Sequence, residues 1–272
     1  MAPTAEPPFR REKLYSLWLT PRFEMPKDLW ESVGPILFEG REYVPPEEAN
    51  PWFFVLGDND RQGVINYSEE LDCLHEDLDF ALIDMETAQE DSYSDRLMKV
   101  DASMYFRRLA LSYHTENVDL RVYAYREKVF KLVQHCFGLR GLKDGNRLKD
   151  HVRNALVRHD LRSIALLLDT LGDSAGVQAA LGRRKLFTHG LKERDQLGFL
   201  TTTARINDSA EGLDAIAKAQ RYMDLDAAYR QRWSEINELC ASLAQFRFHL
   251  VQRLTAADTW QRWHAANPPD AR

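Results

Sequence analysis

The segment at residues 68–85, SEELDCLHEDLDFALIDM, decides the fold class of this chain. A serine followed by two glutamates is typical of a helix N-cap and a first turn in which the helix dipole favours acidic side chains. The apolar residues then recur at intervals of three or four, which is the spacing of one face of an α-helix. They are Leu71, Leu74, Leu78, Ala81, Leu82 and Met85. The segment therefore predicts a helix over residues 68–90.

Proline distribution extends this prediction along most of the chain. No proline occurs between Pro51 and Pro268. A proline inside a helix removes a backbone hydrogen bond and clashes with the preceding turn, so a long stretch without proline favours helices. Apolar spacing predicts further helical regions at about 93–139, 146–172, 174–190 and 208–266. Thr115 or Asn117 is a candidate break that would divide the region at 93–139 into two helices. We expect an all-α helical bundle.

The N-terminal part of the chain has a different amino-acid composition. Six prolines fall between residues 14 and 67 and leave no room for a helix of ordinary length. Between them lie ILFEGREYV at 36–44 and WFFVLGD at 52–58, which are aromatic or β-branched in places and are bounded by glycine and proline. We predict a small extended or β arm over residues 1–67 and one helical domain over residues 68–266.

Composition restricts the class of protein. The chain has 272 residues, of which 44% are hydrophobic and 29% charged, which is ordinary for a soluble globular protein. We find no apolar run long enough for a membrane helix and no apolar core of a signal peptide. The three cysteines are widely spaced, which favours neither a disulfide framework nor a zinc site, so we expect a cytoplasmic protein. Phosphate-loop, dinucleotide-binding, zinc-protease and serine-hydrolase motifs are missing from the sequence, and we expect no cofactor and no metal.

Charge is unevenly distributed along the chain. The net charge is −6, but residues 69–95 carry eleven acidic residues and no lysine or arginine, whereas residues 121–194 carry 16 lysines and arginines against 7 acidic residues. A basic middle segment can bind a polyanion locally even in an acidic protein. Solvated helix faces explain the same pattern, so charge alone does not decide the function.

One short motif carries possible chemistry, RRKLFTH at residues 183–189. Cleavage of RNA by its own 2′-hydroxyl needs an imidazole to move protons and a cation to stabilise charge on the phosphate oxygens. Arg184 and His189 supply these two groups, and Arg183 and Lys185 supply cations for neighbouring phosphates. Arg184 and His189 point about 140° apart on an α-helix. A second copy across a two-fold axis would bring two such sets around one cleft.

Other residue pairs are weaker candidates. Arg153 and Asn154 with His159 form a second arginine–histidine set, which we keep as the reserve for the motif. A metal site at His151 and His159, or a catalytic pair at His135 and Cys136, has little support from spacing. The aromatic residues between positions 222 and 263 favour a buried core, with a dimer face as the alternative. Both arginine–histidine sets are also compatible with ordinary surface residues on basic helices.

The chain resembles the HEPN superfamily (higher eukaryotes and prokaryotes nucleotide-binding domain) in the order of its helices and motifs along the sequence. The resemblance rests on the helical layout, on YAYREKVFKLVQHCFGL at 123–139 and on RRKLFTH at 183–189, and it covers about residues 68–255. It implies a dimeric, metal-independent endoribonuclease of toxin–antitoxin or antiviral defence systems. Arg184 would be the phosphate-stabilising arginine, with Arg183 equally well spaced, and His189 the acid and base.

The resemblance implies RNA, a second copy of the chain and an antitoxin or defence protein as partners. Lys185 stands where family members often have asparagine, and inactive members are common. A HEPN-like module that binds RNA, nucleotide or a protein without cleavage is therefore the alternative function. The third candidate function is that of a helical partner protein whose acidic segment at 69–95 mimics a nucleic acid.

Overall fold

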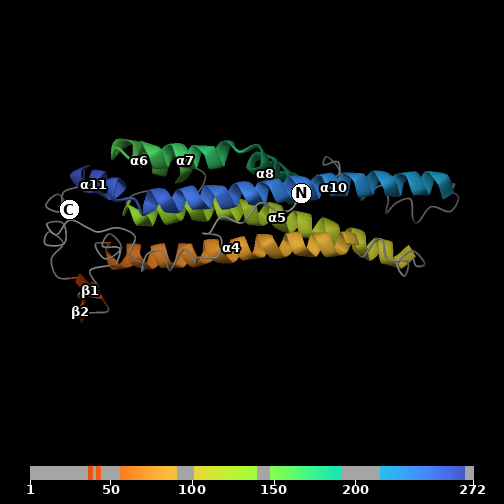
Figure 1. Ribbon diagram of the computed structural model, residues 1–272, viewed down its shortest axis with the longest axis horizontal. Helices are drawn as coiled ribbons and strands as arrows, with labels where there is room; N and C mark the ends of the chain where they lie inside the picture. The colour runs from red at the N-terminus through yellow and green to blue at the C-terminus, as the bar shows by residue number, and fades with distance from the viewer. Residues whose placement is uncertain are drawn as a thin grey trace. The chain divides into compact units, whose positions relative to one another are not determined.

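The computed structural model describes residues 36–38, 41–43, 56–90, 101–139, 148–190 and 215–266. Almost all of them are helical, which confirms the predicted all-α class. None of the described helices is by itself both long and apolar enough to cross a membrane. Figure 1 shows the helices α4 (Asp58–Glu90), α5 (Asp101–Cys136), α6 (Leu148–Arg158), α7 (Arg162–Asp173), α8 (Ala175–Thr188), α10 (Ala215–Leu254) and α11 (Ala257–Ala266).

Two short strands lie in the segment that the sequence predicted as an extended or β arm. β1 (Ile36–Phe38) and β2 (Arg41–Tyr43) pair in an antiparallel ladder, with Ile36 opposite Tyr43 and Phe38 opposite Arg41. Residues 1–35, 39–40 and 44–55 of the predicted arm lie outside the described residues.

Helix α4 begins ten residues earlier than the sequence predicted. Ser68, expected as the N-cap, is fully buried inside the helix, and Val64 extends the buried stripe of Leu71 upstream. The acidic residues in the first turn are Asp58 and Asp60, and the positive end of the helix dipole stabilises their carboxylates there. The predicted domain boundary between residues 67 and 68 therefore falls inside α4, and the division into an arm and a helical domain stays a prediction.

Three further helix boundaries differ from the prediction. Helix α5 runs without a break through Thr115 and Asn117. The single helix expected at 146–172 is two helices, because Asp160 adopts φ +58° and closes α6. There the Leu161 N–H donates to the Leu156 carbonyl at 2.8 Å, which is the long bond of a Schellman motif. The region expected at 208–266 is divided by a turn at residues 255–256 into α10 and α11.

The chain forms two compact units, and α4, α5 and α10 contribute residues to both. The first unit comprises residues 1–73, 125–172 and 243–272. Its core includes Phe137, which directly follows α5. The ring centroid of Phe137 lies 5.1 Å from that of Trp260 and 5.4 Å from that of Trp263. A buried ion pair between Asp72 and Arg247 joins α4 to α10. The predicted aromatic core is confirmed at these two tryptophans, whereas Trp233 and Phe248 are only half-buried.

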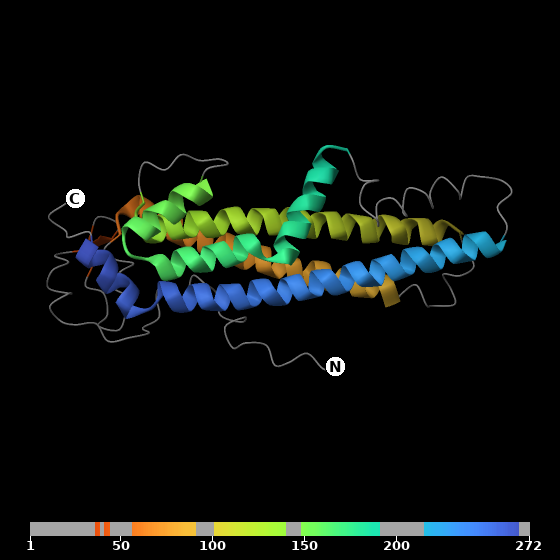
Figure 2. The same cartoon turned by 90° about the horizontal axis from the view of Figure 1, so that it is seen from above.

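The second unit comprises residues 74–124 and 173–242 and contains the 183–189 motif. Two side-chain contacts join α4 to α5: an ion pair from Arg121 to Asp77 at 3.0 Å, and His114 Nδ1, which lies 3.8 Å from Asp84 Oδ2. Figure 2 shows α8 crossing the direction of the long helices at a steep angle. At Gly176 an added Cβ would lie 3.2 Å from Leu239 Cδ1, so α8 approaches α10 closely.

Candidate functional site

Arg183 anchors α8 through a buried ion pair. Its Nε donates to Asp119 Oδ2 at 2.9 Å, and its Nη2 donates to Asp119 Oδ1 at 2.8 Å. Asp119 lies on α5 and is completely buried, and Arg183 is nearly so. A bidentate arginine–carboxylate pair of this kind fixes orientation as well as distance, because both planar groups must align.

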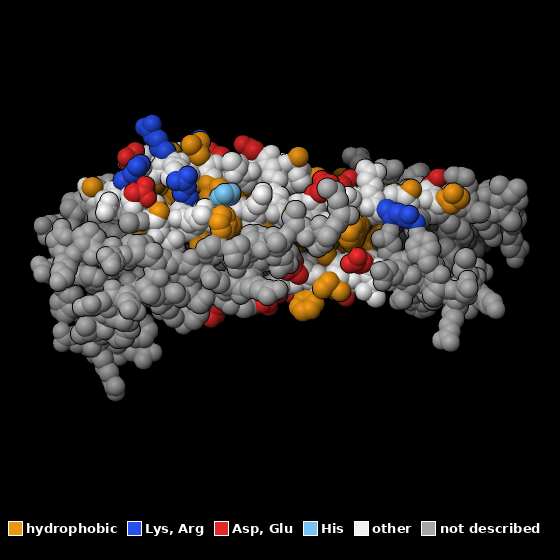
Figure 3. Space-filling model, in the orientation of Figure 1, with side chains coloured by type: hydrophobic (Ala, Val, Ile, Leu, Met, Phe, Trp, Pro, Cys, Tyr) orange, Lys and Arg blue, Asp and Glu red, His pale blue; other side chains and the backbone are white. Residues whose placement is uncertain are grey.

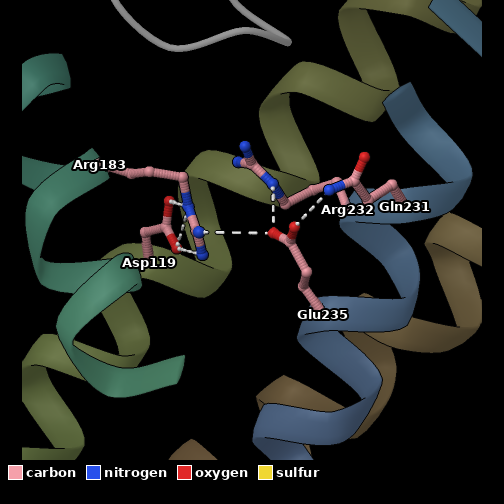
Figure 4. A network of polar contacts seen from close by, with 5 residues as sticks. All are labelled: Asp119, Arg183, Gln231, Arg232 and Glu235. Carbon is pink, nitrogen blue, oxygen red and sulfur yellow. Dashed lines mark hydrogen bonds and ion pairs between the residues drawn. The ribbon is translucent and has the colours of Figure 1, made fainter. Parts of the chain in front are cut away.

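Glu235 of α10 extends this pair into a network, shown in Figure 4. Arg183 Nη1 lies 3.8 Å from Glu235 Oε2, and Arg232 Nε lies 3.2 Å from the same oxygen. Gln231 Nε2 donates to the other carboxylate oxygen at 3.2 Å. Side chains from α5, α8 and α10 thus meet at one polar centre that is buried at Asp119 and exposed at Glu235.

The local sequence explains why this centre forms. Asp119 follows Val118 in the buried stripe of α5, and a lone carboxylate there would be costly to remove from water. On α8, Arg183 lies on the same helix face as Val177 and Ala180, which are both buried. Helix α8 therefore packs with Arg183 against this buried acid.

Arg184 lies against a second side chain of α5. Its guanidinium carbon is 3.6 Å from the ring centroid of Tyr123, which is the geometry of a cation–π contact. Tyr123 is one helical turn after Asp119, so consecutive arginines of α8 contact the same region of α5. The buried Nε of Arg184 has no hydrogen-bond partner within the part of the chain that the structure describes. Stacking occupies the face of the guanidinium and leaves its edge donors to bind an oxygen acceptor.

Lys185 and His189 are exposed at the C-terminal end of α8. His189 is the C-cap residue, and its backbone N–H donates to the Lys185 carbonyl at 3.1 Å. Gly190 follows with φ +69°, in the left-handed region where glycine avoids the strain of a Cβ. An ammonium and an imidazole are therefore presented to solvent near a stacked guanidinium.

The structure places the four predicted site residues in three different environments. Arg183 points inward to Asp119, which makes it an anchor of α8 and not an exposed phosphate ligand. Arg184 is half-buried on Tyr123, and Lys185 and His189 are exposed. Among the described residues there is no contact between Arg184 and His189, as their separation of about 140° around the helix leads one to expect.

The reserve set is not brought together. Arg153 Nε donates to Asp169 Oδ2 at 2.8 Å, which joins α6 to α7. His159 instead contacts Trp263, with ring centroids 4.7 Å apart. Burial and the nearby Arg158 lower the pKa of His159.

Two of the weak metal and cysteine candidates, His159 and His135, contact other side chains. No group of three potential metal-ligating side chains occurs in the described ranges. His135 Nδ1 lies 3.0 Å from Asp60 Oδ1, and its ring stacks on Tyr67. Cys136 is buried, and burial together with Asp60 raises the pKa of its thiol, which leaves the thiol protonated and unreactive.

Sequence reasoning did not identify the partners that orient the motif. Asp119 and Arg183 are separated by 64 residues. Tyr123 is the first residue of the segment at 123–139 that carries the resemblance, but nothing in that segment marks it as a partner of Arg184, and Glu235 belongs to no motif. One signal was present, since an acid occupies a position in the apolar stripe that includes Val118. A buried acid requires a cation, but the sequence does not say which of many arginines supplies it.

No family model, no curated protein and no solved structure matches this chain.

Proposed function

We propose that this chain is a HEPN-type, metal-independent endoribonuclease in which Arg184 and His189 carry the chemistry. The observation that supports it is the end of α8, where a stacked guanidinium, an exposed ammonium and an exposed imidazole follow one another within six residues. The sequence resemblance to the HEPN superfamily supplies the reaction. A role in a toxin–antitoxin or defence system in the cytoplasm belongs to the same proposal.

The residues suit cleavage by the RNA 2′-hydroxyl. The neutral imidazole of His189 accepts the 2′-hydroxyl proton while the 2′-oxygen attacks phosphorus. Arg184 stabilises the negative charge that grows on the phosphate oxygens, and Lys185 binds a neighbouring phosphate. The 5′-oxygen leaves with a proton from a second imidazole, which gives a 2′,3′-cyclic phosphate and a 5′-hydroxyl.

The separation of Arg184 and His189 makes a second copy part of this proposal. One α8 directs the two side chains about 140° apart, whereas a two-fold axis places the histidine of one copy near the arginine of the other. The second imidazole that protonates the leaving group then comes from the second copy. Arg183 acts as a positioning residue, because its pair with Asp119 holds α8 in place.

A binding module without catalysis is the second candidate. The observation that favours it is the cation–π contact of Arg184 with Tyr123, which holds the guanidinium against α5 without contact to His189 while its edge donors still face a phosphate. In this reading Arg184 and Lys185 bind the RNA backbone and His189 has no chemical role.

Cleavage of labelled RNA by the full chain in EDTA tests the proposal. We expect His189→Ala to lower the cleavage rate by at least about 100-fold while RNA affinity changes little, because a general base contributes that much to the transition state. His249→Ala is the matched control, since His249 is also exposed but lies on α10, and it should cleave like wild type. Cyclic phosphate ends identify the mechanism.

Mixing of two inactive variants tests the shared site. A mixed dimer of Arg184→Ala and His189→Ala copies keeps one arginine–histidine pair from opposite chains but only one of the two imidazoles. Mixing should therefore restore part of the activity, with water protonating the leaving group in place of the second imidazole. Full activity of His189→Ala alone would disprove the nuclease. Binding that is lost in Arg184→Ala, with no cleavage by wild type, would establish the module without catalysis instead.

A further inference from the structure

Large apolar side chains are exposed on one part of the second unit. Phe80 and Ile83 of α4 are 64% and 56% exposed, and Tyr113 and Leu120 of α5 are 63% and 47% exposed. Seven large hydrophobic side chains are exposed in the part of the chain that the structure describes, and these four fall on one helix pair. Such clustering marks an interaction site more often than scattered single residues do.

The two side-chain contacts between α4 and α5 show that the four apolar side chains lie at the same level along the helices. Asp77 pairs with Arg121 and Asp84 with His114, so the helices run antiparallel in this region. Phe80 and Ile83 lie between the two paired acids of α4. On α5, Tyr113 and Leu120 each directly precede a paired residue.

The buried residues of the same helices show that the four side chains also share a face. Phe80 lies about 200° around α4 from the buried Leu78, and Leu120 lies about 200° around α5 from the buried Val122. Both therefore point away from the core that α4 and α5 cover together. We call Phe80, Ile83, Tyr113 and Leu120 the outer patch.

Acidic side chains surround the α4 half of the outer patch. Residues 62–90 contain no lysine or arginine, and Glu76 and Glu86 are exposed one turn before Phe80 and one turn after Ile83. In Figure 3 hydrophobic side chains stand out at the lower edge of the view along α4, with Asp and Glu side chains beside them. A nucleic acid would be repelled by this surface, whereas lysine and arginine side chains would be attracted.

We propose that the outer patch is a docking site for a protein partner that presents an amphipathic helix with basic flanks. Apolar side chains at three- and four-residue intervals on that helix would cover the outer patch, and its lysines and arginines would face the acids of α4. This inference concerns a surface other than the end of α8, and it does not rest on the proposed nuclease.

Fluorescence anisotropy of a labelled helical peptide tests the proposal with the full chain. The probe is a peptide of about 18 residues made of leucine and lysine, with leucine at positions i, i+3, i+4 and i+7 of the repeat. We expect wild type to bind it at about 0.15 M salt, and the double variant Phe80→Ser/Ile83→Ser to bind at least about tenfold more weakly. Both side chains are more than half exposed, so the variant should fold normally, which circular dichroism checks.

Matched controls separate docking from general stickiness. Leu166→Ser removes an equally exposed apolar side chain from α7, at 63% exposure, and should leave the affinity unchanged. Glu86→Lys should weaken binding of the leucine–lysine peptide, and a peptide with glutamate in place of lysine should not bind to wild type.

Three results would overturn the inference. Wild type that does not bind the leucine–lysine peptide has no such docking site. Equal binding by wild type and Phe80→Ser/Ile83→Ser places the peptide elsewhere. A wild-type chain that self-associates in sedimentation, and becomes monomeric in the double variant, shows that a second copy covers the outer patch in place of a different protein.

Discussion

Replacing Asp119 by alanine is expected to destabilise the protein strongly. Asp119 is completely buried and accepts bonds from Arg183 Nε at 2.9 and 3.2 Å and from Nη2 at 2.8 Å. Asp119→Ala leaves the guanidinium buried beside an apolar methyl group. Removing one partner of a buried ion pair typically costs about 3–5 kcal/mol of unfolding free energy. The carboxylate of Glu235 stays 3.8 Å from Arg183 Nη1 but is 44% exposed, so it compensates in part. We therefore expect a loss of about 3 kcal/mol.

A second variant distinguishes the ion pair from the space that it fills. Replacing both partners, as in Asp119→Leu/Arg183→Met, removes the buried charges and keeps most of the volume, so much of the lost stability should return. Urea denaturation followed by circular dichroism measures both variants against wild type. The reasoning is refuted if Asp119→Ala loses less than about 1 kcal/mol, or if the double variant is less stable than the single one.

Two further predictions concern glycines and a histidine of the described helices. In Gly63→Ala the new Cβ would lie 2.4 Å from His135 Cγ, so we expect a loss of about 1–3 kcal/mol in urea denaturation. Gly182→Ala is the matched control: an added Cβ meets nothing within 4 Å, and it should stabilise α8 by about 0.5–1 kcal/mol. Equal effects of the two substitutions would contradict the packing at Gly63. Because burial and Arg158 lower the pKa of His159, the unfolded chain binds a proton more readily, and stability should fall as pH drops below about 6.5. His159→Gln should weaken this dependence between about pH 7.5 and pH 5.5, and an unchanged slope would show that other groups cause it.

The helices themselves were largely predictable, because their signals are local. The apolar stripe of Val118, Val122 and Val129 is buried as its spacing indicates. Errors occurred where an alternative local signal was equally good. Ser68 followed by two glutamates has the form of an N-cap, but it lies inside α4 because buried positions continue upstream to Val64.

Interruptions of helices were harder to predict than helices. Nothing in the spacing of apolar residues required α6 to end at Arg158, since the stripe continues into Ile164. Asp160 ends it by adopting a positive φ, which aspartate tolerates but seldom signals. The turn allows Arg153 of α6 to reach Asp169 of α7.

The motif at residues 183–189 shows where local information stops. Composition and spacing alone place Arg183, Arg184 and Lys185 on one helix and identify them as cations, because charge and helix propensity are properties of single residues and near neighbours. Which of the three faces inward depends on Asp119, 64 residues away, since only the packing of α8 on α5 determines which guanidinium meets a buried carboxylate. Tertiary structure therefore assigns the anchor to Arg183, the cation–π contact to Arg184 and the solvent-exposed charge to Lys185.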